Sequence, residues 1–410
     1  MKQYFFFEIG NFPKLSEEEL SSTLPEFEQE SLIEKHILIG SFASPSVLSP
    51  GKDIEKRKIQ EKFDELGGVL RYGYSHKITQ NLDELTLCII SILTKKHEEY
   101  AKKLCFGITL FSDVGGRQQN SFLQRILLTV KKKCQKLGIS VRFINRDFRS
   151  LDTGTYHKEA LWKEEHTEFF IFEDQNGYIL GETLAAQDVE LFARRDFGKP
   201  VRDMNVGMLP PKLALMMVNF SRKANGSLPS SIWDPFCGTG SILIEAEKIG
   251  ITTFGSDISV EMVKASQKNM RFFFPKYDTS SVFEHDVMQK LSKKIHVEAI
   301  VSEGCLGPIF HHSISLDEFQ KAVNEVSPVY FGFFQNLSKS FSGKKIILSV
   351  PFWKMKNGDF QYLENILELA TEFGYTCEAF HHGTRRGSLE FIRENQVVGR
   401  EIFRFIPQNL

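Results

Sequence analysis

The sequence lacks several features that would set it apart from ordinary globular proteins. No apolar run reaches the roughly 18 residues that a membrane-spanning helix needs, and Glu8 interrupts the apolar start of the chain, which argues against a signal peptide. The six cysteines are scattered without a C-x-x-C pair, so we expect no metal site, and a reducing cytoplasm is the simplest compartment. A chain of 410 residues with this composition suggests two or three domains and no membrane partner.

The chain also lacks a strong net charge, at −1, which argues against bulk electrostatic binding of nucleic acid. The distribution is nevertheless uneven. Residues 1–50 hold three Lys and eight Glu, whereas residues 95–149 hold thirteen Lys or Arg against four Asp or Glu. Because a polyanion responds to the face that it meets, this basic segment predicts RNA contact. A solvated lysine-rich helix is the alternative for its central lysines. The candidate RNA-binding residues are Lys131, Lys132, Lys133, Arg142 and Arg146.

The first half of the chain mixes strand and helix patterns in no regular order. We expect an α+β segment at residues 1–50, with Ser16 and Glu19 forming a capping box at the start of a helix. A small α+β domain is expected at residues 51–190. Within it, strands at 168–172 and 178–183 flank an Asn-Gly turn, which predicts a hairpin.

The second half, residues 191–410, alternates strand and helix patterns. Such alternation predicts a doubly wound parallel sheet and therefore an α/β fold. Two strand patterns close together near the end of the chain suit an antiparallel edge on that sheet.

The most informative stretch runs from Asp234 to Gly240, Asp-Pro-Phe-Cys-Gly-Thr-Gly, between an expected strand and an expected helix. Gly238 and Gly240 let the backbone approach a ligand closely, and the first N–H groups of the helix point at it. A dinucleotide fingerprint fails because its third glycine is Leu243, and the Gly-Lys-Ser/Thr of a phosphate-binding loop is absent. A nucleoside ligand without phosphate fits the turn better.

Acidic residues favour S-adenosylmethionine as that ligand. Asp257 ends the next expected strand, where a carboxylate binds a ribose diol. Asp234 suits a ligand that carries a cationic amino acid and a sulfonium, and Asp286 follows a third strand, near the expected adenine amine. Phe236 and Ile258 complete the predicted donor site, for which a plain tight turn in an α/β domain is the alternative reading.

Several stretches resemble the THUMP-domain tRNA guanine-N2-methyltransferases and their bacterial relatives. They are residues 194–214, 234–240 and 255–259, together with the opening 4–16 and the closing 396–402. The resemblance implies a class I (Rossmann-like) methyltransferase domain at 191–410. It also implies an N-terminal α+β THUMP-like RNA-binding domain at 51–190, the module with which that family docks the tRNA acceptor end.

The expected catalytic motif stands at residues 302–308, Ser-Glu-Gly-Cys-Leu-Gly-Pro, where the relatives often have Thr-Glu-Pro-Tyr-Leu-Gly-Pro. An exocyclic amine is a poor nucleophile, so hydrogen-bond acceptors must orient it. Ser302, Glu303 and the carbonyl of Gly304 provide them. Cys305 stands where the relatives have the aromatic residue that stacks on the base. This stacking contact, worth roughly 1–3 kcal/mol, is lost unless the ring of Phe310 makes it instead. A nucleophilic role for Cys305 and a buried filler role are the two other readings.

We therefore expect an S-adenosylmethionine-dependent methyltransferase that acts on the exocyclic N2 amine of a guanosine in tRNA. Two alternatives stay open. A DNA adenine-N6 methyltransferase shares the acceptor geometry, and an RNA-binding relative could retain the fold with a weak or inactive site. An activator subunit or a homodimer is compatible with the sequence.

Overall fold

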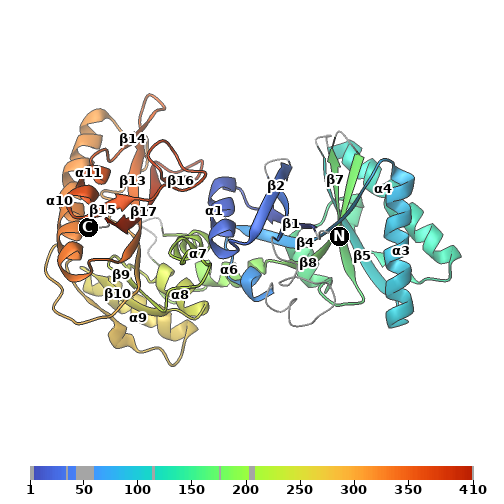
Figure 1. Cartoon of the computed structure of the whole chain (residues 1–410), viewed down its shortest axis with the longest axis horizontal. Coiled ribbons are helices and arrows are strands. Elements are labelled where there is room, and N and C mark those ends of the chain that lie inside the picture. Colours follow the sequence, from blue (N-terminus) through green and yellow to red (C-terminus); the bar gives the residue numbers. More distant parts are fainter. Residues whose placement is uncertain are drawn as a thin grey trace. The chain divides into compact units, whose positions relative to one another are not determined.

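The computed structural model describes residues 4–33, 36–42, 60–112, 116–174, 177–202 and 208–408. The chain forms two compact units (Figure 1). The first comprises Met1–Pro13, Glu26–Asp64 and Val69–Leu191, and the second comprises Lys14–Pro25, Glu65–Gly68 and Phe192–Leu410. The last division thus falls beside residue 191, where the methyltransferase domain was predicted to begin. The predicted boundary between residues 50 and 51 lies outside the described residues.

The described part of the first unit contains a sheet with the strand order β2-β3-β1-β4-β8-β7-β5-β6. Strand β5 runs parallel to β6 and β7, and the other neighbours are antiparallel. The predicted hairpin is confirmed as β7–β8, whereas β2 and β3 were not predicted. Strands β1–β3, from the segment expected at 1–50, share this sheet with the strands that follow. The bounds are β1 Tyr4–Ile9, β2 Phe27–Ile33, β3 Ile37–Phe42, β4 Val69–Thr79, β5 Leu104–Phe111, β6 Val141–Phe143, β7 Thr167–Asp174 and β8 Gly177–Ala186.

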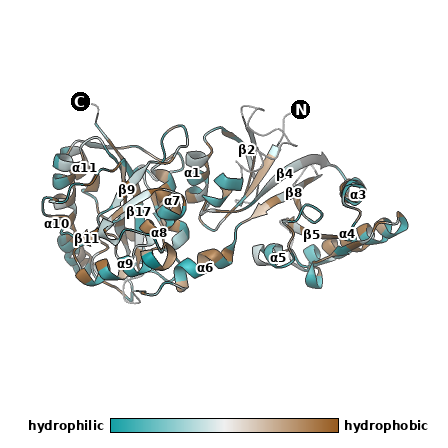
Figure 2. Cartoon of the chain, turned by 90° about the horizontal axis from the view of Figure 1, so that it is seen from below, coloured by the Kyte–Doolittle hydropathy of each residue, from teal (hydrophilic) through white to brown (hydrophobic). Residues whose placement is uncertain are grey.

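Helices α3 (Leu82–Tyr100) and α4 (Gly116–Lys136) cover the β5 side of this sheet. Figure 2 shows hydrophobic and hydrophilic residues alternating along α4. Its buried residues recur at helical spacing and pack against the strands, so its lysines face outward. After β6 come the short helices η2 (Arg146–Phe148) and α5 (Thr153–Lys158).

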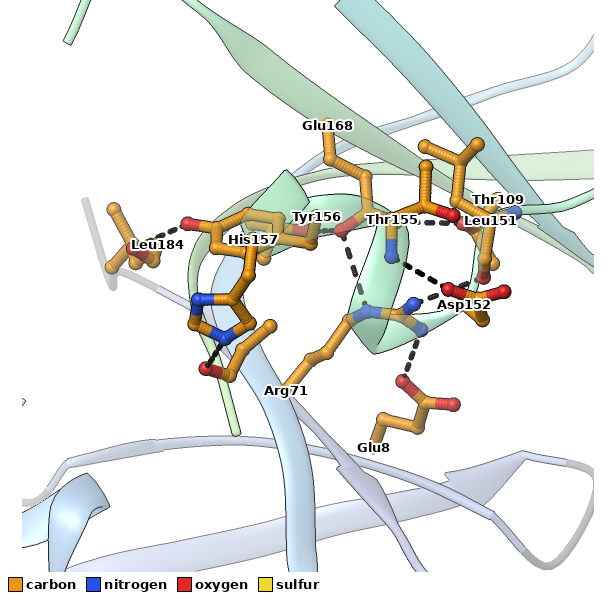
Figure 3. Close-up of polar contacts among 12 residues, drawn as sticks. Glu8, Arg71, Thr109, Leu151, Asp152, Thr155, Tyr156, His157, Glu168 and Leu184 are labelled. Carbon is orange, nitrogen blue, oxygen red and sulfur yellow. Dashed lines mark hydrogen bonds and ion pairs between the residues drawn. The ribbon is translucent and has the colours of Figure 1, made fainter. Parts of the chain in front are cut away.

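A buried arginine fastens the middle of the first sheet (Figure 3). The guanidinium of Arg71, on β4, donates to the Glu8 carboxylate at 2.7 Å and to the Leu151 carbonyl at 2.9 Å. Its Nε lies 3.4 Å from the buried Glu168 carboxylate, which also accepts from Thr109 at 2.7 Å. Because burial of a lone charge is costly, these partners are what make the buried arginine tolerable.

The sheet of the second unit has the order β11-β10-β9-β12-β13-β17-β15, with β14 beside β13 and β16 beside β17. The first five strands of that order are parallel, and β17 is antiparallel to both of its neighbours. This confirms the doubly wound α/β fold and its antiparallel edge. The bounds are β9 Ser231–Asp234, β10 Thr252–Asp257, β11 Val282–Glu284, β12 Ala299–Glu303, β13 Lys345–Lys354, β14 Phe360–Tyr362, β15 Tyr375–Cys377, β16 Leu389–Phe391 and β17 Val398–Pro407.

Helices cover both faces of this second sheet (Figure 1). Helices α10 and α11 pack on one face around Trp233, Phe334 and Phe403, whereas α8 and α9 pack on the other around Leu243 and Met270. Among the described helices, none is long and apolar enough to cross a membrane. The bounds are α6 Val189–Phe197, α7 Pro211–Phe220, α8 Ser241–Lys248, α9 Val260–Phe273, η3 Thr279–Ser281, α10 Leu316–Ser340 and α11 Ile366–Glu372.

Helix α1 (Pro13–Thr23) belongs to the second unit apart from its first residue. Two consecutive buried glutamates attach it there. The Glu17 carboxylate lies 3.1 Å from Nε2 of His382, and the Glu18 carboxylate accepts from the backbone N–H of His381 at 2.9 Å. Glu18 also lies 3.6 Å from the Arg404 guanidinium. An early helix of the sequence is therefore a structural part of the late domain.

The third glutamate of α1, Glu19, is fully buried and binds backbone. Its two oxygens accept from the N–H groups of Gly67 and Gly68, at 2.8 and 2.7 Å, and from the Asn219 amide at 2.7 Å. The predicted capping box of Ser16 and Glu19 is wrong, because the helix begins at Pro13 and Glu19 turns to these donors instead.

Glu19 makes the stability of the second unit dependent on pH. Burial raises its pKa to about 7, above the value of an exposed glutamate, despite the opposing hydrogen bonds. The protonated form is thus favoured by folding, so the contribution is complete at acidic pH and declines as pH rises toward 7. We expect wild-type stability to fall by up to about 1.4 kcal/mol per pH unit in that window. Urea unfolding of Glu19→Gln should show a slope smaller by up to that amount, because Asp234 and Glu401, whose pKa values are raised as well, keep their own contributions. The exposed control Glu372→Gln should keep the wild-type slope. A wild-type profile flat between pH 5 and 7 would contradict the assignment.

Candidate functional site

The candidate site lies where the chain order of the second sheet reverses. From β9 the chain proceeds outward to β10 and β11, and it then returns to the other side of β9 as β12. At such a point, the helices that follow two adjacent strands lie on opposite faces of the sheet. This opens a crevice at the carboxyl ends of the strands. The residues that end β9, β10 and β12 are Asp234, Asp257 and Glu303, and Asp286 follows β11 closely. The topology therefore brings four acids to one edge.

A cavity of about 540 Å³ opens at this edge. All four acids line it, together with apolar side chains such as Met208, Ile242 and Val329. None of the described residues that line it is a lysine or an arginine. Such a cavity repels phosphate and favours a ligand with positive charge and an apolar body.

Asp234 is the most deeply buried of these acids. Its Oδ1 accepts from Ser302 Oγ at 2.5 Å and from the backbone N–H of Phe236 at 3.1 Å. Burial, together with the nearby carboxylates of Asp257 and Glu303, raises the pKa of Asp234 to about 8 despite the hydrogen bonds from Ser302 and Phe236. A cation placed beside Asp234 would restore its charge, so the site is electrostatically prepared for one.

The glycine turn is held open by Asp257. Its Oδ2 accepts from the Gly238 N–H and its Oδ1 from the Ser259 N–H, each at 2.9 Å. Gly238 and Gly240 adopt φ values of +49° and +86°, which other residues rarely tolerate. A side chain at Gly240 would also meet Ser266 Oγ at 2.7 Å. The predicted loop glycines are thus required by the backbone itself.

The other predicted donor-site residues also line the cavity. Phe236 contacts it from the loop after β9, and Ile258, which is 65% exposed, contacts it from the end of β10. Asp286 is oriented by the Met288 N–H, which donates to its Oδ1 at 2.9 Å. The sequence did not indicate His285 or Met288, although both adjoin Asp286 and line the same wall.

The predicted catalytic residues divide into two groups. Ser302 is fully buried and is not among the described lining residues, and its hydroxyl donates to the Asp234 carboxylate and so positions that acid. Glu303, Gly304 and Cys305 do line the cavity. Glu303 forms an ion pair with the buried Arg400 of β17, a partner that the sequence did not reveal.

The glycine of the catalytic motif is fixed by packing. The Gly304 N–H donates to the Ser349 carbonyl at 2.9 Å, a bond that proline could not make. A Cβ at this position would approach Tyr330 Oη to 2.6 Å, and that hydroxyl donates to the Cys305 carbonyl at 2.9 Å. The departure from the Pro-Tyr pattern is therefore built into the surrounding core. Phe310 packs against that core and is not a lining residue.

Burial raises the pKa of the Cys305 thiol. The thiol form is therefore favoured, which weighs against the nucleophilic reading, since the thiolate is the reactive species. Cys305 is half-buried, whereas its interpretation as a small buried filler residue predicts full burial.

The predicted RNA-binding residues lie in the first unit, not at this cavity. Lys131, Lys132 and Lys133 belong to α4, and the Lys131 ammonium lies 5.5 Å from the centre of the Phe143 ring. Arg142, on β6, donates to Glu159 at 2.9 Å, and Arg146 lies 3.9 Å from the same carboxylate.

The strand order and the acid-lined cavity at the switch point together define a class I methyltransferase domain. Residues 200–307 match the family model described as "RMKL-like, methyltransferase domain". The strand order confirms the predicted fold class, and the family match places a methyltransferase-like domain within the second unit.

Several individual proteins are similar to this chain. The chain is 27% identical over 227 residues to a tRNA (guanine(10)-N2)-dimethyltransferase of Methanocaldococcus jannaschii, covering 54% of this chain and 58% of that protein. A Methanothermobacter thermautotrophicus protein of the same name is 45% identical over 67 residues, or 16% and 19% of the two chains. The chain thus spans less than two thirds of these relatives. The crystal structure of TrmN from Thermus thermophilus aligns over 99% of both chains with 12% identity and a TM-score of 0.49. The sequence matches confirm the resemblance to the guanine-N2-methyltransferase family.

The cavity fits S-adenosylmethionine, the donor that this class of domain uses. The charges that act most strongly on the buried Asp234 are the carboxylates of Asp257 and Glu303, and such an acidic surrounding suits the ammonium and sulfonium of the donor. The space at Gly238 is open, with no atom within 4 Å of a Cβ placed there, so a nucleoside can approach the loop. Asp257 retains lone pairs for ribose hydroxyls beside its two backbone bonds.

Proposed function

We propose that this protein is an S-adenosylmethionine-dependent RNA methyltransferase that modifies the exocyclic N2 amine of a guanosine in tRNA. One observation carries the proposal. The cavity at the switch point holds four carboxylates and, among its described lining residues, no lysine or arginine. The printed function of the matched relatives supports guanine-N2 as the target. The six cysteines, all free thiols, suit a reducing compartment such as the cytoplasm.

The residues of the cavity divide the work between donor and acceptor. When bound, the donor supplies a methyl group already activated on sulfur, so catalysis consists mainly of positioning. Asp234 would hold the ammonium, Asp257 the ribose hydroxyls and Asp286 the adenine amine. On the acceptor side, the Glu303 carboxylate and the Gly304 carbonyl would accept the N–H groups of the guanine, which aims the nitrogen lone pair at the methyl group. The amine loses one proton to solvent after transfer.

The first unit would supply the RNA contact. Its basic residues on α4, β6 and η2 suit the phosphate backbone, which dominates the affinity of such proteins. We propose that this unit is the THUMP-like module implied by the resemblance. An RNA substrate presents its target base only if that base leaves the stack.

Methyl transfer to defined nucleic acids tests the proposal. The purified chain would be supplied with a methyl-labelled donor and either a tRNA transcript or duplex DNA, followed by mass spectrometry of the nucleosides. We expect N2-methylguanosine in the tRNA and no label in the DNA. Asp234→Asn should abolish transfer, whereas the exposed control Glu284→Gln should not. N6-methyladenine in the DNA would replace this function with the alternative one. Donor binding by calorimetry without any transfer would point to a binding protein with an inactive site.

A further inference from the structure

One of the three tryptophans is exposed. Trp233 and Trp353 are buried in the second unit, at 2% and 0% exposure, whereas 60% of the surface of Trp162 is exposed in the first unit. Trp162 follows α5, a short helix of the first unit that is labelled in Figure 2. Its neighbour Leu161 is buried, at 2% exposure, so the backbone is held while the indole points outward.

The segment that carries Trp162 is firmly attached to the sheet. Tyr156 donates from its hydroxyl to the Leu184 carbonyl at 3.2 Å, and His157 Nε2 donates to the Ala186 carbonyl at 2.9 Å (Figure 3). After the tryptophan, the Lys96 ammonium donates to the Glu164 carbonyl at 2.9 Å. The indole is thus presented from a turn that is fixed on both sides.

The backbone of this turn is also strained. Ala160 has a φ of +52°, in the left-handed region that an alanine seldom adopts. The Leu161 N–H nevertheless donates to the Tyr156 carbonyl at 3.0 Å and closes the turn. A left-handed residue with this bond is a common ending of a helix, so the end of α5 fixes the backbone that leads to Trp162.

A cation lies beside the exposed ring. The Lys163 ammonium lies 5.9 Å from the ring centre. Glu159, three residues earlier, is paired with Arg142 and with Arg146, whose side chains are 50% and 80% exposed. Two further acids follow the ring: Glu164 accepts from the Tyr100 hydroxyl at 3.2 Å, and the pKa of Glu165 is lowered by its own backbone N–H and by nearby charges that include Lys163. Each of these acids therefore has a partner of its own, and the cation at the ring is Lys163.

From this combination we infer that Trp162 is a stacking platform for an unpaired base, and that it receives a single-stranded stretch of RNA. The inference rests on the RNA substrate of the proposed function and adds the form of RNA that this surface recognises. In a duplex the faces of the bases are covered by their neighbours, so only an unpaired base can lie on the indole. Lys163 and the exposed Arg142 and Arg146 of the same unit would attract the phosphates of the strand. An acidic protein segment would use the cations but would have no need of a flat, exposed ring.

Tryptophan fluorescence tests the inference directly. Because Trp233 and Trp353 are buried, emission that solvent quenchers reach comes from Trp162. We expect a short single-stranded oligoadenylate to quench this emission and its duplex with oligouridylate to leave it unchanged. Trp162→Ala should weaken binding of the single strand about tenfold without altering the salt dependence, and Trp162→Phe should retain most of the affinity. The matched control is Leu137→Ala, which removes another exposed apolar side chain of the same unit.

The outcomes separate this inference from the proposed function. Saturating single-stranded RNA without quenching, or wild-type affinity in Trp162→Ala, would overturn it, even if tRNA is methylated. Quenching by an acidic peptide but not by RNA would also overturn it and would assign the surface to a protein partner. Quenching by the single strand without methyl transfer would support it and would count against the enzyme proposal alone.

Discussion

Replacing Arg400 by methionine is expected to destabilise the second unit by about 3 kcal/mol and to reduce methyl transfer severely. Arg400 is 2% exposed and pairs with Glu303, so its loss leaves that carboxylate without its buried partner. The cost falls at the lower end of the range for buried pairs because the Glu303 side chain keeps 20% of its surface exposed. The shift in the urea midpoint and the rate of transfer to tRNA would measure the two effects.

A double substitution separates stability from catalysis. In Glu303→Gln combined with Arg400→Met, the unpaired charge is absent, so most of the stability should return while transfer stays low. Arg393→Ala serves as the control, since Arg393 lies in the exposed segment just before β17, and it should change stability by less than about 0.5 kcal/mol. If the single variant Arg400→Met unfolds at the wild-type midpoint, the pair has no energetic importance. If the double variant transfers methyl groups normally, the negative charge of Glu303 is not needed to orient the amine.

Asp257→Ala is expected to weaken binding of S-adenosylmethionine by about 1–3 kcal/mol, or roughly 5- to 150-fold. Two losses combine in this variant. The ribose hydroxyls lose their acceptor, and the N–H groups of Gly238 and Ser259 lose theirs, so the glycine turn is no longer held. Calorimetric titration with the donor measures the change.

Glu261 provides a matched control for that titration. It is an exposed acid four residues further along the chain that accepts from the Ser259 hydroxyl at 3.0 Å. Glu261→Ala should bind the donor with wild-type affinity. Unchanged affinity in Asp257→Ala would show that the ribose lies elsewhere. Equal losses of affinity in both variants would indicate that the substitutions damage α9, and not that a contact with the ribose is lost.

Local sequence was sufficient where a strand, a turn and a helix follow one another. The glycine turn, Asp257 and Asp286 all line the cavity because each ends or closely follows its own strand. Hydrophobic periodicity likewise predicted most strands of the second sheet. The short strands β14 and β16 were missed, because each has only three residues and lies beside the main path of the sheet, outside the alternation of strands and helices.

Contacts between residues that are far apart in the chain could not be predicted from the sequence. Arg400 lies 97 positions from Glu303, and only the antiparallel register of β17 brings the two together. Ser302 was expected to accept from a substrate, yet its hydroxyl donates to Asp234, which a linear motif does not reveal. Glu19 was assigned to a helix cap because its spacing from Ser16 fits one, whereas the stronger donors come from residues 67 and 68. In each case the deciding partner is distant in the chain.

The route of the chain between the two units has a consequence for how such a protein can evolve. The polypeptide enters the second unit with α1, leaves it, returns for residues 65–68, leaves again and comes back at residue 192. No single cut in the gene therefore releases either unit whole. Recombination that joined the second unit, cut at residue 192, to a different first unit would strip it of α1 and of the glutamates that attach this helix. The two halves are expected to be inherited as one piece, with insertions tolerated only in surface loops.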